Sequence, residues 1–235
     1  MSLDSPKFGD VRALVFDLDG TLIDSGLDLA LAVSATVKKM GRAALEHQQI
    51  FSYVGRGAQR LIEQALGPGA TEEECRTGLA YFLAYYREHM LDNTATYPGV
   101  REGLAALEGM PMAILTNKPV RFSQQILHGL GLSRYFRYIY GGNSFQTKKP
   151  DPAGMETLLR DFGAAPRQAM LVGDSDVDVL TARNAGTWAC GVSYGLGSAR
   201  FTQCPPDLLV DTLIDLAERL DYQATAPHGR GEVRK

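Results

Sequence analysis

The stretch Val11-Arg12-Ala13-Leu14-Val15-Phe16-Asp17-Leu18-Asp19-Gly20-Thr21-Leu22 decides the fold of this chain of 235 residues. Its apolar first half, residues 11–16, predicts a buried parallel strand. Open α/β sheets bind ligands at the carboxyl ends of their strands, so Asp17 and Asp19 are expected at such an edge. Side chains alternate along an extended chain, and both carboxylates can therefore face one ligand. Acids this close repel each other, and a metal ion or a reacting centre offsets that repulsion.

The composition excludes several classes of protein. A formal net charge of −3 gives no electrostatic footprint for nucleic acid or a membrane surface, and no apolar run approaches the ~20 residues of a membrane span. The N-terminal residues lack the pattern of a signal peptide. Cys75, Cys190 and Cys204 form no CxxC pair, which favours a reducing, cytoplasmic location over a disulfide frame or a zinc site.

The hydrophobic pattern divides the chain into two kinds of segment. Residues 24–96 show helical periodicity and no strand signal, and Thr71-Glu72-Glu73-Glu74 is a capping-box helix start. From Pro98 onwards, short strands alternate with helices, which predicts βαβ units and a mainly parallel sheet. The expected later strands are residues 112–115, 138–140, 169–172, 188–192 and 208–210, and the expected helices are residues 100–107, 122–130, 152–162, 177–184 and 213–220.

The predicted fold class is α/β, with a Rossmann-like, mainly parallel sheet core and an inserted all-helical cap domain. The core is expected from residues 1–22 and 97–222, and the cap from residues 23–96. Residues 223–235 are expected to be a disordered tail. Within the cap, the helical spacing of Tyr81, Phe82, Tyr85 and Tyr86 favours cap core or an interface over a ligand-stacking site.

Four polar clusters lie after predicted strands or before predicted helices. Besides Asp17 and Asp19, they are Thr116-Asn117, Lys149-Pro150-Asp151-Pro152 and Gly173-Asp174-Ser175-Asp176-Val177-Asp178. Parallel strands share one carboxyl edge, so these clusters should converge. Magnesium prefers carboxylates, waters and a phosphate oxygen, and such a cation would let the acids accept a phosphoryl group held by Lys149 and Thr116. One carboxylate can then attack phosphorus, while a second carboxyl group protonates the leaving alcohol and later deprotonates water.

From about Val11 to Leu220, the ordered clusters resemble the motifs of the haloacid dehalogenase-like hydrolase superfamily. Several of these motifs resemble those of one branch of the superfamily, the phosphoglycolate phosphatases. They are Thr116-Asn117-Lys118, Lys149-Pro150-Asp151-Pro152, Ala182 and Ala185-Gly186. The resemblance implies a Mg²⁺-dependent phosphatase that acts on a small phosphorylated metabolite through an aspartyl phosphate. Phosphoglycolate is the first candidate substrate. The state of assembly is left open between a monomer and a homodimer.

The resemblance also implies a role for each matching residue. Asp17 is the implied nucleophile, Asp19 the general acid/base, and Lys149 the lysine that screens the nucleophile and the transferring phosphoryl group. Thr116 and Asn117 are implied to bind phosphate. The implied metal ligands are Asp17, Asp19 through its backbone carbonyl, Asp174, and Asp178, which acts through water or by orienting Lys149. Asp176 has no implied role.

Two questions stay open at the level of sequence. Arg56, in the cap loop Val54-Gly55-Arg56-Gly57-Ala58, either reaches a substrate carboxylate or is the exposed arginine of a plain turn. The function is a phosphatase or, as alternatives, a phosphosugar mutase of the same superfamily or a non-enzymatic binding or regulatory domain. A dehalogenase needs neither Asp19 nor Asp174 and is disfavoured. A phosphonate hydrolase needs a cap lysine for a Schiff base, and it is disfavoured because the only cap lysines, Lys38 and Lys39, lie at the end of an expected helix.

Overall fold

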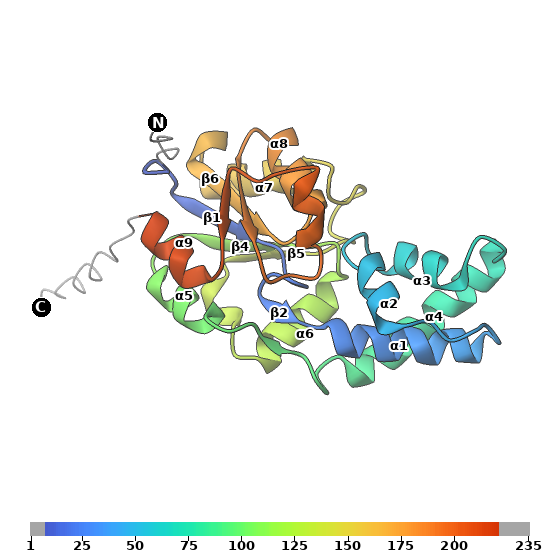
Figure 1. The fold of residues 1–235 in the computed structure, drawn as a ribbon. Helices are drawn as coiled ribbons and strands as arrows, with labels where there is room; N and C mark the ends of the chain where they lie inside the picture. The colour runs from blue at the N-terminus through green and yellow to red at the C-terminus, as the bar shows by residue number, and fades with distance from the viewer. Residues whose placement is uncertain (1–7, 221–235) are drawn as a thin grey trace, which may run out of the picture.

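The computed structural model describes residues 8–220, which form a parallel sheet with helices on both faces and four helices beside it (Figure 1). Within these residues, the main sheet has six strands in the order β5-β4-β1-β6-β7-β8, and every pairing is parallel. The strands are β1 (Ala13–Phe16), β4 (Met112–Leu115), β5 (Tyr138–Tyr140), β6 (Ala169–Gly173), β7 (Trp188–Val192) and β8 (Leu208–Val210). The predicted α/β class with a mainly parallel sheet is confirmed.

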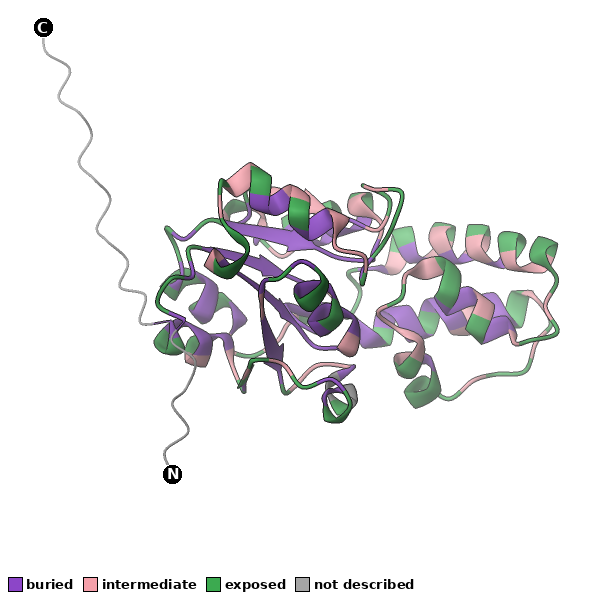
Figure 2. Cartoon of the chain, turned by 90° about the horizontal axis from the view of Figure 1, so that it is seen from above, coloured by how far each residue is buried: buried purple, intermediate pink, exposed green. Residues whose placement is uncertain are grey.

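Helices bury both faces of this sheet. One face carries α5 (Val100–Ala106), α6 (Val120–Gly129) and α9 (Leu213–Arg219), and the other carries α7 (Ala153–Phe162) and α8 (Asp176–Asn184) (Figure 1). Side chains of β1 alternate between the two layers: Leu14 and Phe16 pack with the first set, and Ala13 and Val15 with the second. The strand is therefore apolar at every position, and Figure 2 shows the strands as the buried centre of the fold.

The register of the sheet sets where the polar clusters begin. Phe16 is the last residue of β1 and lies level with Ile114 of β4 and Val172 of β6. The amide of Asp17 then donates to the carbonyl of Val172 over 2.9 Å, which fixes Asp17 at the end of the ladder. The residues that follow β1, β4 and β6 thus leave the sheet at one edge.

Four helices lie beside that edge, namely α1 (Gly26–Lys39), α2 (His47–Tyr53), α3 (Ala58–Leu66) and α4 (Glu72–His89) (Figure 1). The predicted capping box at the start of α4 is confirmed, because Thr71 Oγ1 accepts from the Glu74 amide and the Glu74 carboxylate accepts from the Thr71 amide. Phe82 and Tyr86 are buried on the inner face of α4, as their spacing predicts.

Two features differ from the sequence-based expectation for residues 24–96. Strand β2 (Ile23–Asp24) pairs antiparallel with β3 (Ala95–Thr96), where the sequence carries no strand signal, because a ladder of two residues on each side has no detectable alternation. Helix α2 lies in the segment predicted to be helical, but the sequence gives no bounds for it, since its seven residues bury only Ile50 and show no apolar stripe.

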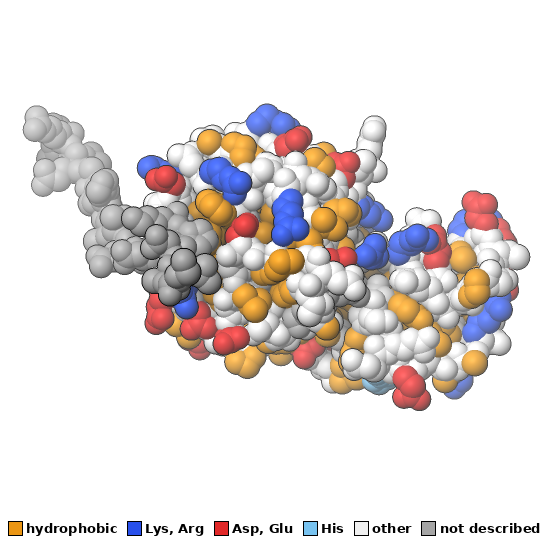
Figure 3. Space-filling model, turned by 45° about the horizontal axis from the view of Figure 1, so that its top comes forward, with side chains coloured by type: hydrophobic (Ala, Val, Ile, Leu, Met, Phe, Trp, Pro, Cys, Tyr) orange, Lys and Arg blue, Asp and Glu red, His pale blue; other side chains and the backbone are white. Residues whose placement is uncertain are grey.

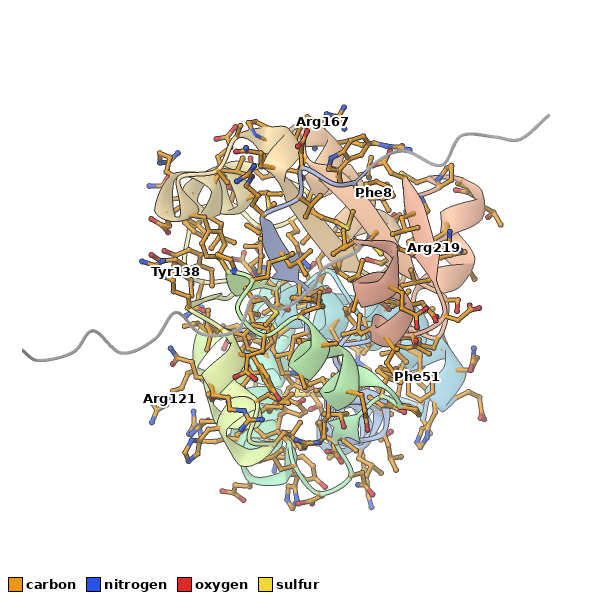
Figure 4. All side chains as sticks on the ribbon, turned by 90° about the vertical axis from the view of Figure 1, so that its left-hand side faces the viewer. Phe8, Phe51, Arg121, Tyr138, Arg167 and Arg219 are labelled. Carbon is orange, nitrogen blue, oxygen red and sulfur yellow. The ribbon has the colours of Figure 1, made fainter. Side chains whose placement is uncertain are left out.

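The end of the sheet opposite the four helices is closed by aromatic packing. Figure 4 views the molecule from this end and shows Phe8 and Arg167 close together. The ring of Phe8 meets Trp188 edge-on at 5.1 Å, and the Arg167 guanidinium lies 4.4 Å from the centre of the Trp188 ring. Within residues 8–220, no helix is long and apolar enough to cross a bilayer. The predicted tail, residues 223–235, lies outside the described residues.

Candidate active site

The carboxyl edge of the sheet brings the predicted polar clusters together. Asp17 follows β1, Thr116 and Asn117 follow β4, and Asp174 follows β6. Lys149 comes from the loop between β5 and α7, and Asp178 from the first turn of α8. All six side chains belong to buried residues, although each carries a charge or a polar group. Burial of this kind requires partners for every charge.

Three of the acids form a compact group. Asp17, Asp174 and Asp178 each offer a carboxylate oxygen, and these three oxygens lie within 4.8 Å of one another. Glycines allow this approach: a Cβ at Gly20 would overlap the Asp174 carboxylate, and a Cβ at Gly173 would overlap Asp178. The absence of a side chain at Gly20 and Gly173 therefore allows the acids to lie close together.

Lys149 is the cation that contacts this group. Its ammonium lies 2.6 Å from Asp178 Oδ1 and 3.0 Å from Asp17 Oδ1. The second oxygen of Asp178 accepts hydrogen bonds from the amide and the hydroxyl of Ser175, so Asp178 is held at the helix start while it holds the lysine. Lys148, the preceding residue in the sequence, is exposed.

One lysine does not balance three buried carboxylates. Burial raises the pKa of Asp17 to about 6, with Lys149 opposing the rise and Asp178 adding to it. Burial, followed by the charges of Asp178 and Asp17, raises the pKa of Asp174 well above its ordinary value. No lysine or arginine described in the structure forms an ion pair with Asp174, whose Oδ2 accepts a hydrogen bond from the Gly197 amide at 2.8 Å.

The donor set fits a divalent cation. Carboxylate oxygens are the ligands that hard cations such as Mg²⁺ and Ca²⁺ prefer, and a positive ion would offset the charge that Lys149 leaves uncompensated. Asp17 and Asp174 are the acids with oxygens available to it, because Asp178 is already bonded through both oxygens to Lys149 and Ser175. This arrangement matches the implied alternative in which Asp178 orients Lys149.

The Asp19 side chain lies apart from the three-acid group. Its Oδ1 accepts from Ser25 Oγ at 2.5 Å and from Lys118 Nζ at 2.9 Å, and its Oδ2 lies 3.2 Å from the same ammonium. Two carboxylates that are two positions apart thus have separate partners, Lys149 for Asp17 and Lys118 for Asp19. The two carboxylates therefore lie in separate electrostatic surroundings.

Asn117 ties three segments together. Its side-chain amide donates to the carbonyls of Lys149 and Gly55, at 3.1 and 3.0 Å, and its oxygen accepts from the Lys149 amide at 3.0 Å. Gly55 belongs to the turn between α2 and α3, so the bond joins the sheet edge to the four-helix part. The Thr116 hydroxyl is buried beside Asn117 and accepts from the Lys118 amide at 3.3 Å.

Arg56 lies on the outer rim. Its guanidinium is 3.2 Å from the carboxylate of Asp176, and its side chain is 54% exposed. Lys and Arg side chains gather on the surface where the four helices meet the main body (Figure 3). Arg56 therefore bridges from the helical part to the first turn of α8, and its role toward a substrate stays a prediction.

Lys118 has no role predicted from the sequence, although it belongs to the motif Thr116-Asn117-Lys118. Its side chain is 4% exposed, and its ammonium contacts Asp19, donates to the Tyr86 hydroxyl over 2.8 Å and lies 4.5 Å from the centre of the Tyr86 ring. Burial lowers the pKa of Lys118, but Asp19 and Tyr86 outweigh it and raise the pKa above its ordinary value. Its position directly after two site residues was the available signal.

A pocket opens between the sheet edge and the four helices. Asp17, Asp19, Thr116, Asn117 and Lys118 line its floor. The remaining lining residues, mostly apolar, are Leu29, Tyr53, Val54, Gly55, Gly57, Ala58, Leu61, Phe82, Leu83, Tyr86, Pro119 and Phe122. The site is thus a small, mainly apolar hollow with its charges concentrated on one side.

Comparison with known proteins agrees with this geometry. A family model described as "Haloacid dehalogenase-like hydrolase" matches residues 14–192. The chain is 39% identical over 235 residues to phosphoglycolate phosphatase 1 of Pseudomonas aeruginosa, covering 95% of this chain and 86% of that relative. It is 37% identical over 219 residues to a phosphoglycolate phosphatase of Colwellia psychrerythraea, covering 89% and 97%. A crystal structure titled as a predicted phosphoglycolate phosphatase from Haemophilus somnus superposes with a TM-score of 0.82 at 33% identity, covering 89% and 97%.

Proposed function

The chain belongs to the haloacid dehalogenase-like hydrolases and is a phosphomonoesterase, and on that premise we propose that it transfers the phosphoryl group to Asp17 before water releases it. The observation that carries the proposal is the buried group of Asp17, Asp174 and Asp178 around the ammonium of Lys149. We propose Mg²⁺ as the cofactor, held by the carboxylates of Asp17 and Asp174 and the backbone carbonyl of Asp19, with Asp178 beside them. When bound, the ion would supply positive charge to the phosphoryl oxygens.

Asp17 is the proposed nucleophile. One of its oxygens attacks phosphorus, the bond from phosphorus to the ester oxygen breaks, and an acyl phosphate forms on Asp17. Lys149 positions the carboxylates of Asp17 and Asp178, because its ammonium contacts both of them. The Thr116 hydroxyl and the Asn117 backbone amide are the proposed donors to the phosphoryl oxygens, next to the lysine and at the same edge of the sheet.

Asp19 is the proposed general acid and base. It gives a proton to the leaving alkoxide in the first step and takes one from the water that attacks the acyl phosphate in the second. Its side chain faces the same pocket as Asp17 but is held by Ser25 and Lys118 rather than by Lys149. The two acids are therefore positioned for different tasks.

We propose that residues 23–96 act as a cap over the site. Its four helices are continuous with the sheet part through β2 and β3, and several contacts join them to the sheet edge. The Gly55 carbonyl accepts from Asn117, the Tyr86 hydroxyl accepts from Lys118, and Arg56 pairs with Asp176. Closure of this kind excludes bulk water from a reactive acyl phosphate.

2-Phosphoglycolate is the proposed substrate, because the relatives named above are phosphoglycolate phosphatases and the pocket beside Asp19 is small. The test is phosphate release from a panel of phosphomonoesters that includes 2-phosphoglycolate, p-nitrophenyl phosphate and sugar phosphates, with Mg²⁺ or with EDTA. We expect turnover with Mg²⁺, none with EDTA, and none for Asp17→Asn. Failure to release phosphate from any member of the panel would contradict the proposed reaction, and formation of an isomeric sugar phosphate faster than free phosphate would favour a mutase.

A further inference from the structure

The buried ammonium of Lys118 is unusual because of where it faces. Among the residues that line the pocket between the sheet edge and the four helices, Lys118 is the only cationic side chain. The lining around it is mostly apolar, and the side chain of Lys118 is 4% exposed. A buried positive charge in such surroundings favours an anionic partner.

We propose that Lys118 recognises a carboxylate on the leaving alcohol of the substrate and so selects a short, acidic phosphomonoester. This inference rests on the proposed function, since it assigns the substrate class of the same site. In this proposal Lys149 lies beside the phosphoryl group, and Lys118 binds the carboxylate of the leaving alcohol.

The distances allow this contact. The general acid must reach the ester oxygen by a hydrogen bond, and Lys118 Nζ lies 2.9 Å from an oxygen of Asp19. The other Asp19 oxygen lies 3.2 Å from Nζ, so a further hydrogen bond of about 2.8 Å from either oxygen places Nζ within ~6 Å of the ester oxygen. In a two-carbon leaving group the carboxylate is separated from that oxygen by one methylene, and its oxygens fall inside this range.

The ammonium can hold a substrate carboxylate without releasing Asp19. A lysine ammonium has three N–H donors. Within residues 8–220, its hydrogen-bond partners are the two oxygens of the Asp19 carboxylate, which one N–H can share, and the Tyr86 hydroxyl. One donor therefore remains for a ligand. The Tyr86 ring and hydroxyl, which come from α4, fix the ammonium at the pocket wall.

Arg56 is the competing candidate for the same contact. Gly55 and Gly57 line the pocket, but Arg56 itself does not, and its guanidinium pairs with Asp176 on the exposed rim. A charge buried in the pocket discriminates more strongly between an acidic and a neutral group than one that is exposed to water, because water screens the exposed charge. The geometry thus favours Lys118.

The experiment compares two substrates that differ only in the charged group, 2-phosphoglycolate and ethyl phosphate. The measured quantity is the ratio of their kcat/KM values, with Mg²⁺ present. We expect the wild-type ratio to exceed 10, and Lys118→Met to lower it about 10- to 100-fold, the range expected for a charge-assisted hydrogen bond. Both rates will also fall together, because Lys118 contacts Asp19, and the ratio removes that shared loss.

Arg56→Met is the matched control, and we expect it to keep the ratio within about twofold of wild type. An unchanged ratio for Lys118→Met, or a larger loss for Arg56→Met, would overturn the inference. If Lys118→Met does not fold, the test uses the wild-type ratio of the two kcat/KM values. A ratio near 1 would overturn the inference. Turnover of neither substrate by the wild-type protein would instead contradict the proposed function.

Discussion

The ammonium of Lys149 lies 2.6 Å from Oδ1 of Asp178, and both side chains are 2% exposed. The pair joins the loop before α7 to the first turn of α8. It therefore fixes these two segments relative to each other and also balances two buried charges. Asp17 shares the same lysine at 3.0 Å. Stability and catalysis therefore depend on the same few groups at this edge of the sheet.

Lys149→Met should strongly destabilise the metal-free protein at neutral pH. Removing one partner of a buried ion pair leaves uncompensated charge and costs about 3–5 kcal/mol. Urea unfolding in EDTA measures this loss, and added Mg²⁺ should recover part of it, because the ion would replace some of the missing positive charge. The control is Lys148→Met, at the exposed neighbouring position, which should leave the unfolding midpoint in place. Equal stability of the two variants would contradict the assigned role of Lys149.

Asp17→Asn should stabilise the metal-free protein while abolishing turnover. Burial raises the pKa of Asp17 to about 6, whereas an unfolded aspartate titrates near ~3.9. Between these values the folded protein keeps a proton that the unfolded chain has lost, so the free energy of unfolding falls as pH rises through the window. Above this pH window, the wild-type protein has lost all of the stability that protonation of Asp17 provides. We therefore expect Asp17→Asn to raise Tm by roughly 2–4 °C, equivalent to about 1 kcal/mol in the free energy of unfolding.

The measurement for Asp17→Asn is Tm in EDTA at pH 7 and near pH 4. The gain over wild type should be present at pH 7 and should be much smaller at the lower pH, where Asp17 is protonated in the folded state and about half protonated in the unfolded chain. A variant that is less stable than wild type at pH 7 would show that the Asp17 charge stabilises the metal-free fold.

Asp174→Asn should remove the response of the protein to Mg²⁺. Asp174 has no described cationic partner, and its pKa is raised well above the ordinary value, first by burial and then by Asp178 and Asp17. A ligand at 100 times its Kd stabilises the folded state by about 2.7 kcal/mol, so the wild-type Tm should rise with Mg²⁺ concentration. Asp10→Asn, in an exposed turn, should respond as wild type does. A wild-type response from Asp174→Asn would exclude it as a metal ligand.

Gly20→Ala should impair both metal response and turnover. Gly20 has a φ of +83°, and a Cβ there would overlap the Asp174 carboxylate. Gly163 supplies a control, because its φ of +64° is also in the left-handed region but a Cβ there meets nothing within 4 Å. Both variants should lose some stability from backbone strain, while only Gly20→Ala should lose phosphate release. Equal activity of the two would show that close approach to Asp174 is unimportant.

Much of this site could be predicted from local sequence. The strand that precedes Asp17 is apolar at every position because both faces of β1 are covered, and such a run is recognisable without a structure. Thr116 and Asp174 follow strands of the same kind, and parallel pairing brings their ends to one edge. Topology alone therefore gives their convergence. The roles of these residues came from the family resemblance and stay predictions.

The contacts of Lys118 could not be predicted in this way. Lys118 lies in a loop, where no periodicity fixes the direction of a side chain, and its partner Tyr86 is 32 positions earlier on α4. Helical spacing predicted Tyr86 in the cap core or at an interface, and the residue is buried, but the spacing gave no sign that its hydroxyl faces the site. The bounds of helix α2 could not be predicted for a related reason, since seven residues with one buried side chain carry too little pattern. Contacts between segments that are distant in sequence require coordinates.

The most direct test of the account is to trap the covalent intermediate. The protein is mixed with Mg²⁺ and ³²P-labelled 2-phosphoglycolate, quenched in acid and digested, and the labelled peptide is sequenced. We expect the label on the peptide that contains Asp17, and no label for Asp17→Asn. Label on a different residue, or steady turnover by Asp17→Asn, would contradict the assignment of Asp17 as the nucleophile.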